Sequence, residues 1–314
     1  MADYQDIRGL RVKYLSADPS NPEDGEVWYN STTGTLRARV LTEAWSSATA
    51  LPQGRDSGTG GGTQTAAYIA GGETTPGTFL NTTFEYDGAT WTASGAMGND
   101  RIRMDLGSIG TQTAGLGVGG YAPGITNAVE EYDGTNWAGG TVLPSPNQQG
   151  GGAGPQTAYL HLGGGAPTTC LSYNGASWAS EGASSEGFAY YGLAGTDTAG
   201  LAFYGAESPP GTNRTTGEEY NGTSWTTAVA TLPDQGNSGT SGGTTASAIF
   251  AGSGTTARYW NGTTVAAAAS MANPRGNAYG AGSGTAFVAS SGNIAPGAVE
   301  EYNFGVTTET LTTS

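Results

Sequence analysis

The stretch Tyr86-Asp87-Gly88-Ala89-Thr90-Trp91 returns along the chain at a nearly constant interval. Three further copies keep the pattern aromatic, Asp or Asn, Gly, two residues, Trp; a fourth ends in Val and a fifth is a fragment: Tyr132–Trp137, Tyr173–Trp178, Tyr220–Trp225, Trp260–Val265 and Tyr302–Phe304. Measured at the last position of the phrase, the steps are 46, 41, 47 and 40 residues, and Trp45 lies 46 residues before Trp91. A repeat of about 40–50 residues made of short strands is typical of the blades of a β-propeller.

A second phrase, a strand that begins with Thr and ends in Gly, occurs six times and predicts six blades. Its copies are Thr65–Gly72, Thr113–Gly120, Thr157–Gly164, Thr198–Gly205, Thr245–Gly252 and Thr285–Gly292. Within one copy we predict an innermost strand in the small-residue run 55–62, a second strand over 66–70 and a third over 83–86. Asp87-Gly88 is then a two-residue hairpin turn and 89–92 the fourth strand, because Asp-Gly between alternating runs is a strong hairpin signal.

The last repeat lacks a Trp strand of its own, which raises the question of how the ring closes. We expect residues 40–48, which carry Trp45, to supply that strand and so remove an unpaired sheet edge. Residues 307–314 compete for the same place, and the sequence leaves both alternatives open. The fold prediction is therefore all-β: a six-bladed propeller over residues 40–305, preceded by an extended arm and hairpin over 1–39 and followed by a tail over 306–314.

The composition restricts the classes of partner that we expect the protein to bind. The 314 residues include 55 Gly, and 26 acidic residues against 11 basic ones give a formal charge of −15. Lys13 is the only lysine, so the clustered cations that nucleic acid or an anionic membrane surface requires are missing. No apolar stretch approaches the roughly 20 residues of a membrane-spanning helix, and one cysteine, Cys170, excludes internal disulfides. We expect neither nucleic-acid binding nor membrane insertion.

Two resemblances add to this reading. Gly-Gly at a strand end, then Tyr, Trp and a Met/Leu-Pro-Arg stretch resembles the kelch repeat; its last element is best kept at Met271-Ala-Asn-Pro-Arg275 and Leu51-Pro-Gln-Gly-Arg55. The string Asp-Pro-Ser-Asn-Pro-Glu-Asp-Gly-Glu-Val-Trp-Tyr-Asn-Ser-Thr-Thr-Gly-Thr-Leu over 18–36 is similar to a segment of tailed-phage fibre and appendage proteins, notably of marine and cyanobacterial phages.

The phage resemblance implies a virion protein whose N-terminal arm docks onto other virion or tail proteins. The docking candidates are the basic, aromatic and apolar side chains of that arm: Arg11, Tyr14, Leu15 and Trp28. The propeller is then displayed outward, and a homo-oligomer is a further partner option.

Candidate catalytic groups are sparse. His161 is the only histidine and lacks the partners a metal site needs, so we expect a structural role and neither metal nor cofactor. The doubled carboxylates Glu130-Glu131, Glu218-Glu219 and Glu300-Glu301 recur at one strand position, which favours a solvated sheet edge over acid–base chemistry. A sialidase-like site would need arginines from several blades to converge: Arg101, Arg103, Arg214, Arg258 and Arg275.

The variable loops give the better functional pointer. In an antiparallel four-stranded blade, the loops after the second and fourth strands emerge on one face, and recognition commonly lies on such loops. We expect glycan binding there, with Phe79, Tyr121 and Asn213 as ligand-binding candidates. The predicted function is thus a non-enzymatic, tail- or fibre-associated virion protein that binds the host surface. A purely structural decoration subunit and a virion glycan hydrolase are the alternatives.

Overall fold

The computed structural model describes residues 12–22, 25–74, 77–185, 187–189, 192–203, 205, 216–231, 239–252 and 254–311. All regular elements in these ranges are β-strands, and none is a helix. The chain divides into two compact units, unit 1 (Met1–Ala44 with Asn303–Ser314) and unit 2 (Trp45–Tyr302). Two long strands, β3 (Thr35–Ser47) and β27 (Val299–Leu311), contribute residues to both units. The region predicted as a tail, 306–311, is therefore strand.

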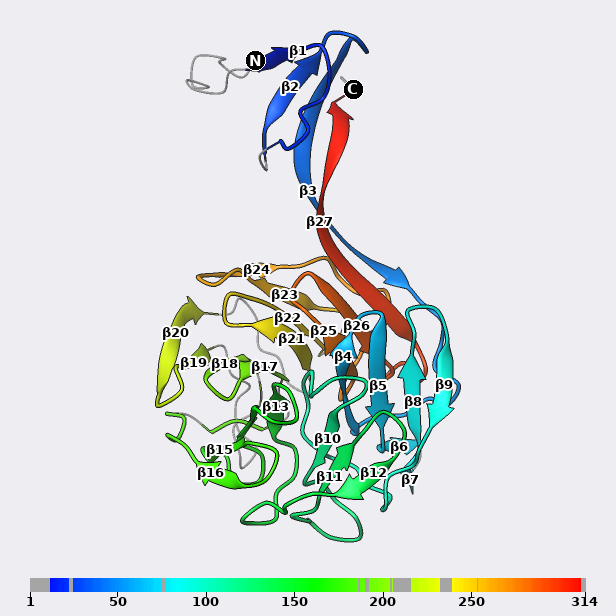
Figure 1. Ribbon diagram of the computed structural model, residues 1–314, viewed down its shortest axis with the longest axis vertical. Coiled ribbons are helices and arrows are strands. Elements are labelled where there is room, and N and C mark those ends of the chain that lie inside the picture. The colour runs from blue at the N-terminus through cyan, green and yellow to red at the C-terminus, as the bar shows by residue number, and fades with distance from the viewer. Residues whose placement is uncertain are drawn as a thin grey trace. The chain divides into compact units, whose positions relative to one another are not determined.

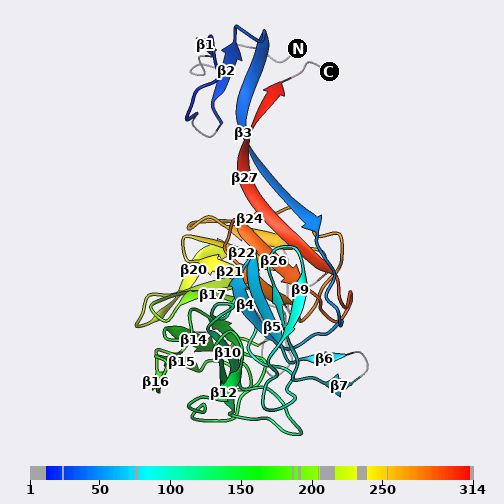
Figure 2. The same ribbon diagram turned by 45° about the vertical axis from the view of Figure 1, so that its right-hand side comes forward.

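Four sheets of unit 2 have four strands each, joined in sequence order by antiparallel pairing. They are β4 (Thr59–Thr63), β5 (Ala66–Ala70), β8 (Thr83–Tyr86) and β9 (Trp91–Ser94); β13 (Gly151–Ala153), β14 (Tyr159–Leu162), β15 (Cys170–Tyr173) and β16 (Trp178–Ser180); β17 (Gly192–Thr196), β18 (Ala199–Phe203), β19 (Thr216–Tyr220) and β20 (Trp225–Thr231); β21 (Thr240–Thr244), β22 (Ser247–Ala251), β23 (Ala257–Trp260) and β24 (Val265–Ala267). A small hairpin, β6 (Glu73–Thr74) with β7 (Thr78–Phe79), follows β5 (Figure 2).

The second repeat has a three-stranded sheet, β10 (Gly115–Val118), β11 (Val129–Tyr132) and β12 (Trp137–Gly139). The place of its innermost strand is taken by an irregular segment, which makes isolated parallel bridges from Leu106 to Gly151 and from Ile109 to Gly154. The last sheet has the order β3-β27-β26-β25, with β25 (Tyr279–Gly282) and β26 (Ala286–Ser290). Its outermost place in unit 2 is occupied by the end of β3 that carries Trp45.

The innermost elements of unit 2 lie beside one another in sequence order. β13 contacts β17, β17 contacts β21, β21 contacts β25, and β25 contacts β4. Between β4 and β13 lies the irregular segment, whose Ile109 amide donates to the Gly60 carbonyl at 2.9 Å and which bridges to Gly151 and Gly154. Figure 1 shows the sheets of unit 2 arranged around a common centre. Crowding there explains the Gly-rich inner strands: a Cβ on Gly61 would lie 1.9 Å from the Ile109 carbonyl oxygen.

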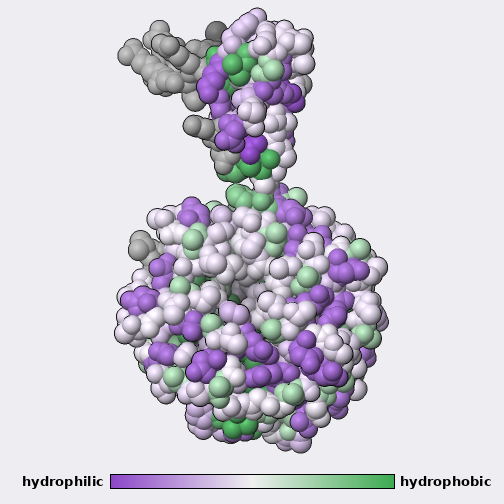
Figure 3. Space-filling view, in the orientation of Figure 1, coloured by the Kyte–Doolittle hydropathy of each residue, from purple (hydrophilic) through white to green (hydrophobic). Residues whose placement is uncertain are grey.

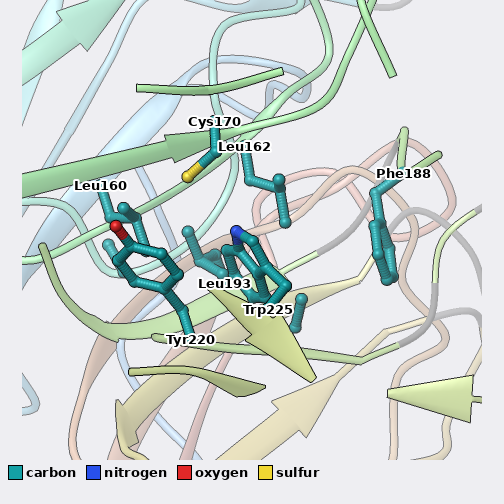
Figure 4. Packing of buried hydrophobic residues seen from close by; sticks show 9 residues of the cluster. Leu160, Leu162, Cys170, Phe188, Leu193, Tyr220 and Trp225 are labelled. Carbon is teal, nitrogen blue, oxygen red and sulfur yellow. The ribbon is translucent and has the colours of Figure 1, made fainter. Parts of the chain in front are cut away.

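The repeated Tyr and Trp form a close cross-strand aromatic pair in the four sheets that keep both residues of the phrase. The centroid distances are 4.7 Å for Tyr86–Trp91 and for Tyr173–Trp178, 5.0 Å for Tyr132–Trp137 and 5.1 Å for Tyr220–Trp225. Aromatic pairs of this kind stabilise a fold by about 0.5–1.5 kcal/mol beyond area burial. In Figure 4, Trp225 packs among buried residues of β14, β15 and β17, including Leu160, Cys170 and Leu193, so the phrase joins neighbouring sheets.

The turn inside the phrase differs from the predicted two-residue hairpin. Tyr86 pairs with Trp91, so the loop has four residues and the fourth strand begins at Trp91 instead of residue 89. The Asp87 carboxylate accepts hydrogen bonds from the Ala89 and Thr90 amides at 2.9 and 2.7 Å, and Gly88 takes φ +88°. Side-chain capping of these amides stabilises a longer turn than the dipeptide alone indicates.

The doubled glutamates are structural, and the predicted solvated edge is wrong for the first member of each pair. Glu130, Glu218 and Glu300 are buried. Glu130 binds Arg101 at 3.0 Å and Glu300 binds Arg275 at 2.9 Å, both through buried guanidinium groups. These arginines serve separate sheets, so they do not converge with one another on a substrate carboxylate.

The second members of two pairs link neighbouring sheets. Tyr173 donates its hydroxyl to Glu131 at 2.5 Å, and Tyr86 donates to Glu301 at 2.7 Å. Tyr132 makes the equivalent bond to Glu85 at 2.6 Å, so each of these three tyrosines binds a carboxylate of another sheet. Hydrogen bonds to charged acceptors are worth about 1.5–3 kcal/mol. We call these bonds the tyrosine–glutamate ladder. They add to the apolar contacts between sheets.

Unit 1 contains a sheet with the order β1-β2-β3-β27. β2 (Val27–Asn30) and β3 form the predicted antiparallel hairpin, while β1 (Lys13–Leu15) pairs with β2 in parallel. Asp18 organises the unit: it accepts hydrogen bonds from the Trp28 indole and the Asn30 amide, each at 2.9 Å, and forms an ion pair with Arg37. The phage-like string therefore encodes the hydrogen-bonded core of a small sheet.

Candidate binding site on the loop face

The antiparallel strand order gathers the variable loops of unit 2 at one end of its sheets. The described parts of these loops, 71–74, 77–82, 119–128, 163–169, 254–256 and 291–298, together with the connectors that lead into the innermost strands, form what we call the loop face. Loop and connector are hydrogen-bonded to each other: Asp56 and Glu73 exchange backbone bonds of 3.1 and 2.9 Å, and Ile102 and Tyr121 exchange bonds of 3.1 and 2.7 Å. Loops and connectors of the loop face are thus held to each other by backbone hydrogen bonds.

Four connector residues form a chain of backbone hydrogen bonds where the innermost strands begin. The Ser57 amide donates to the Asn277 carbonyl at 3.1 Å, Arg103 to Ser57 at 2.5 Å, and Gln149 to Arg103 at 2.8 Å. All four have left-handed backbones, with φ of 61° for Ser57, 58° for Arg103, 63° for Gln149 and 52° for Asn277. Such a conformation costs about 1–3 kcal/mol in a non-glycine residue and persists only where surrounding bonds enforce it. We call these four residues the axial ring.

The axial ring encloses a small cavity of about 10 Å³, which Met104 and Leu106 also line. That volume corresponds to roughly one water molecule. Residues from four different connectors therefore line one cavity. The cavity can hold a single polar atom, whereas a larger ligand would lie outside it.

Phe79 and Tyr121, both predicted from the sequence, lie next to each other on the loop face. Their rings make an edge-to-face contact with centroids 6.0 Å apart, and both side chains are half-buried. The Arg103 guanidinium carbon lies 5.8 Å from the Tyr121 centroid, within cation–π range. Because Arg103 also lines the axial cavity, this residue connects the aromatic pair with the axial ring. The third candidate, Asn213, lies outside the described residues.

The sequence points to Arg103 only as one arginine of the sialidase-like alternative, and not among the glycan-binding candidates, although its exposure sets it apart from the other arginines of the described repeats. Arg55, Arg101 and Arg275 are buried, whereas Arg103 is exposed. Burial, reinforced by the charge of Asp56, raises the pKa of Glu73, and the charge of Arg103 opposes that rise. Burial also raises the pKa of Asp56. Arg103 therefore places a positive charge beside acidic groups and an aromatic pair.

His161 is a structural residue of the described fold. It is fully buried, its Nδ1 lies 2.6 Å from Asp105 and its Nε2 lies 2.8 Å from the Asn147 side-chain nitrogen. Asn147 also donates to the Gly163 carbonyl at 2.8 Å, which fixes the amide orientation, so Nε2 is an acceptor and Nδ1–H donates to Asp105. Tyr159 donates a second bond to Asp105 at 2.7 Å. The network joins two connectors to β14.

The docking candidates of the N-terminal arm differ in how far their side chains are exposed to solvent. Trp28 is fully buried and hydrogen-bonded to Asp18, so its assignment as a docking contact is wrong: the tryptophan stabilises unit 1 from within. Tyr14 is 75% exposed and stacks on Tyr29 with centroids 5.2 Å apart, and Leu15 is half-buried. Arg11 lies outside the described residues.

The ranges described by the structure contain no group of three or more His, Cys, Asp or Glu side chains arranged to hold a metal ion. They likewise contain no helix that is long and apolar enough to cross a membrane. On the face of unit 2 seen in Figure 3, hydrophilic and hydrophobic residues are interspersed among many of intermediate hydropathy.

No family model and no curated protein matches the chain. Among solved structures, the chain is similar to the one titled "Structure of YjhT", with a TM-score of 0.64 over 83% of this chain and 99% of that chain. The two sequences are 16% identical, so the likeness concerns the fold alone. Together with the antiparallel sheets, it supports an all-β, β-propeller-like fold.

Proposed function

We propose that residues 40–305 form a six-bladed, kelch-like β-propeller closed by the segment 40–48. Two observations support this arrangement. The innermost elements are neighbours in sequence order, with the irregular segment of the second repeat between β4 and β13, and β25 contacts β4. Trp45 also forms a tilted aromatic pair with Tyr302, with centroids 5.2 Å apart, at the place where Trp and Tyr pair in the other sheets.

We further propose that the protein is a structural component of a bacteriophage virion, a tail- or fibre-associated propeller that binds the host surface. The N-terminal resemblance to phage appendage proteins motivates the virion location. The observation that carries the binding role is the contact of Phe79, Tyr121 and Arg103 on the loop face. Aromatic residues and arginine dominate binding energy at recognition surfaces because they offer large rigid area and several donors.

The ligand class that fits this cluster is a surface glycan. A half-buried aromatic pair offers an apolar surface to the C–H groups of a sugar ring. Arg103 and the side-chain amides of the axial ring, those of Gln149 and Asn277, offer donors to hydroxyl and carboxylate oxygens. Phe79 pairs with Glu73 in a hairpin, and the loop of Tyr121 is hydrogen-bonded to the connector of Arg103 through Ile102, so little further ordering is needed on binding.

The test is binding of the full chain to host cells and to a glycan array. Tyr121→Ala and Phe79→Ala are each expected to weaken binding at least tenfold, whereas Tyr14→Ala, an exposed tyrosine of unit 1, leaves it unchanged. Parent protein that binds no host glycan would instead favour the decoration subunit. Absence of the protein from purified particles would refute both virion roles.

The hydrolase alternative has less support from the geometry. Glu131 and Glu301 each accept a hydrogen bond from a tyrosine of another sheet, so these two carboxylates serve different sheet boundaries. Incubation with host capsule or lipopolysaccharide separates the cases. Reducing-end release that is abolished by Glu131→Gln, Glu219→Gln or Glu301→Gln would overturn the non-enzymatic proposal.

A further inference from the structure

A pocket of about 330 Å³ lies in unit 2 between the last sheet and the sheet β4-β5-β8-β9. Its walls are the end of β3 with the residues after it, one residue of β27, and the end of β8 with the turn that follows: Ser47, Ala48, Thr49, Glu301, Tyr86, Gly88 and Ala89. Small-molecule pockets have volumes of about 300–1,000 Å³. We call this one the Glu301 pocket. It shares no residue with the Phe79–Tyr121–Arg103 cluster.

The corresponding place is filled at three other boundaries between neighbouring sheets. There the fourth residue after one Trp lies against the carbonyl of the third residue after the Tyr of the next sheet. Thr141 does this by donating its hydroxyl to the Ala176 carbonyl at 2.8 Å. At the other two boundaries the residue is Gly, and a Cβ on it would collide with that carbonyl oxygen: 2.0 Å between Gly95 and Thr135, and 2.4 Å between Gly182 and Thr223.

Thr49 and Ala89 are the matching residues at the boundary of the last sheet. The register is the same, because the Trp91 indole donates to the Thr49 carbonyl at 3.0 Å as the Trp178 indole donates to Thr141 at 2.7 Å. Within the described structure, however, no hydrogen bond joins the Thr49 hydroxyl to Ala89, and both residues line the pocket instead. The pocket is therefore a local departure from the repeat.

The charge of the pocket is negative. Of the seven described residues that line it, Glu301 is the only charged one. Its Oε1 accepts the Tyr86 hydroxyl at 2.7 Å, which leaves the second carboxylate oxygen for another donor. Hydrogen bonds from the Thr90 and Ala89 amides lower the pKa of Asp87, so a second carboxylate, next to Gly88 in the chain, is ionised as well. A positively charged donor suits this site best, since charge-assisted hydrogen bonds are the strong ones.

We propose that the Glu301 pocket binds one amino-sugar unit, whose ammonium group donates to Glu301. Ser47 and Thr49 are exposed, and their hydroxyls can exchange hydrogen bonds with the hydroxyls of the sugar ring. A lysine side chain carries the same ammonium group on an apolar stem. That stem would leave both hydroxyls without a ligand partner, so the lining favours the sugar. Because these walls are exposed, we expect weak binding, in the millimolar range.

The inference does not depend on the proposed loop-face site, and an NMR titration of the full chain with glucosamine tests it. Glucose and N-acetylglucosamine are the matched probes, because they keep the sugar ring and lack the positive charge. Nα-acetyl-lysine amide tests the ammonium group without the ring. We expect glucosamine to shift the amide signals of 47–49 and 86–89, and to bind at least tenfold more tightly than the other three probes.

Two variants and their controls locate the binding. Glu301→Gln keeps an acceptor for the Tyr86 hydroxyl and removes the charge, and Ala89→Lys places a competing ammonium group at an exposed position of the turn. Each should weaken glucosamine binding at least tenfold. The same changes at the boundary that Thr141 fills, Glu131→Gln and Ala176→Lys, should leave it unchanged.

Tyr121→Ala should also leave glucosamine binding unchanged, which separates this pocket from the loop-face site. The inference is overturned if glucosamine shifts no signal of the pocket, or if glucose or N-acetylglucosamine binds equally well. Equal binding of the lysine derivative would assign the pocket to a peptide and overturn it too. So would a loss of binding in the control variants as large as in Glu301→Gln and Ala89→Lys, or binding by those two variants that matches the parent.

Discussion

Trp45 and Tyr302, the first and last residues of unit 2, form a tilted aromatic pair with ring centroids 5.2 Å apart and planes inclined by 43°. Trp45 also contacts Phe287 edge-on at 6.4 Å. The two ends of the unit are thereby joined through the same kind of aromatic pair that the other sheets form within a single hairpin. The stability of unit 2 should therefore depend on the Trp45–Tyr302 pair, whose members are far apart in the sequence, as it does on the Tyr–Trp pairs within single hairpins.

We therefore expect Trp45→Ala to destabilise the protein by about 1–3 kcal/mol, less than a fully buried tryptophan because the side chain is half-buried. For a unit of this size that corresponds to a fall in Tm of roughly 2–12 °C. Trp178→Ala, which removes an equally half-buried partner of Tyr173, is the matched comparison in differential scanning calorimetry. Deletion of residues 40–48 should be more damaging still. A Trp45 variant that melts like the parent would show that this contact does not hold the ends together.

The Arg275–Glu300 pair makes a second test, because both side chains are almost completely buried. Arg275 also donates to the Ser291 and Ala298 carbonyls at 2.8 and 2.6 Å. Replacing it with Met leaves a buried carboxylate without its counter-charge, which costs about 3–5 kcal/mol. Combining Arg275→Met with Glu300→Gln should recover part of that loss. Urea denaturation of the parent, both single variants and the double variant measures the coupling; a cost below 1 kcal/mol is what a solvated pair would give.

Much of the repeat architecture is predictable from the sequence because its signals are local. Tyr86 and Trp91 are close along the chain, and a hairpin brings them together. The turn has four residues where the sequence predicts two, because the Asp87 carboxylate caps two amides and makes a four-residue turn as stable as a shorter one.

The roles of the charged residues were harder to predict, since their partners belong to other strands or sheets. From the sequence alone Glu131 is predicted to be a surface residue, whereas in the structure it accepts a hydrogen bond from Tyr173 of the next sheet. Arg101 and Arg103 are two residues apart, yet one is buried with Glu130 and the other is exposed beside Tyr121. Phe79 and Tyr121 were predictable as a pair because neighbouring loops of a repeat emerge side by side. The burial of Trp28 was not, because it depends on Asp18 folding back onto the hairpin.

Arg103 provides a test of ligand charge at the loop face. If the proposed glycan is acidic, Arg103→Glu should weaken its binding at least tenfold, because repulsion replaces a charge-assisted contact. A neutral polysaccharide should be affected much less. Arg39→Glu makes the same charge change in unit 1 and serves as the control. Biolayer interferometry at low and physiological salt measures both effects; equal losses for acidic and neutral ligands would assign Arg103 a packing role on Tyr121 instead of charge recognition.

The tyrosine–glutamate ladder predicts a loss of stability at alkaline pH. Burial, followed by the hydrogen bond to Glu85, raises the pKa of Tyr132 from its ordinary 10.0 to about 12. Below pH 10 the phenol is protonated in both the folded and the unfolded chain, so its contribution is fully present. Between about pH 10 and 12 the unfolded phenol loses its proton while the folded one keeps it. The free energy of unfolding then falls by up to about 1.4 kcal/mol per pH unit for this tyrosine.

Tyr132→Phe isolates that contribution. At pH 9 the variant should be about 1.5–3 kcal/mol less stable than the parent, because it lacks the hydrogen bond to the Glu85 carboxylate. At pH 11.5 the difference should shrink, since the parent has by then lost part of the stabilisation and the variant has no phenol to ionise. Urea denaturation at both pH values measures the change, with Tyr14→Phe, an exposed ring of unit 1, as the control. A difference between parent and Tyr132→Phe that stays constant from pH 9 to 11.5 would mean that the folded phenol ionises as readily as the unfolded one, and the ladder would then contribute no pH dependence at this position.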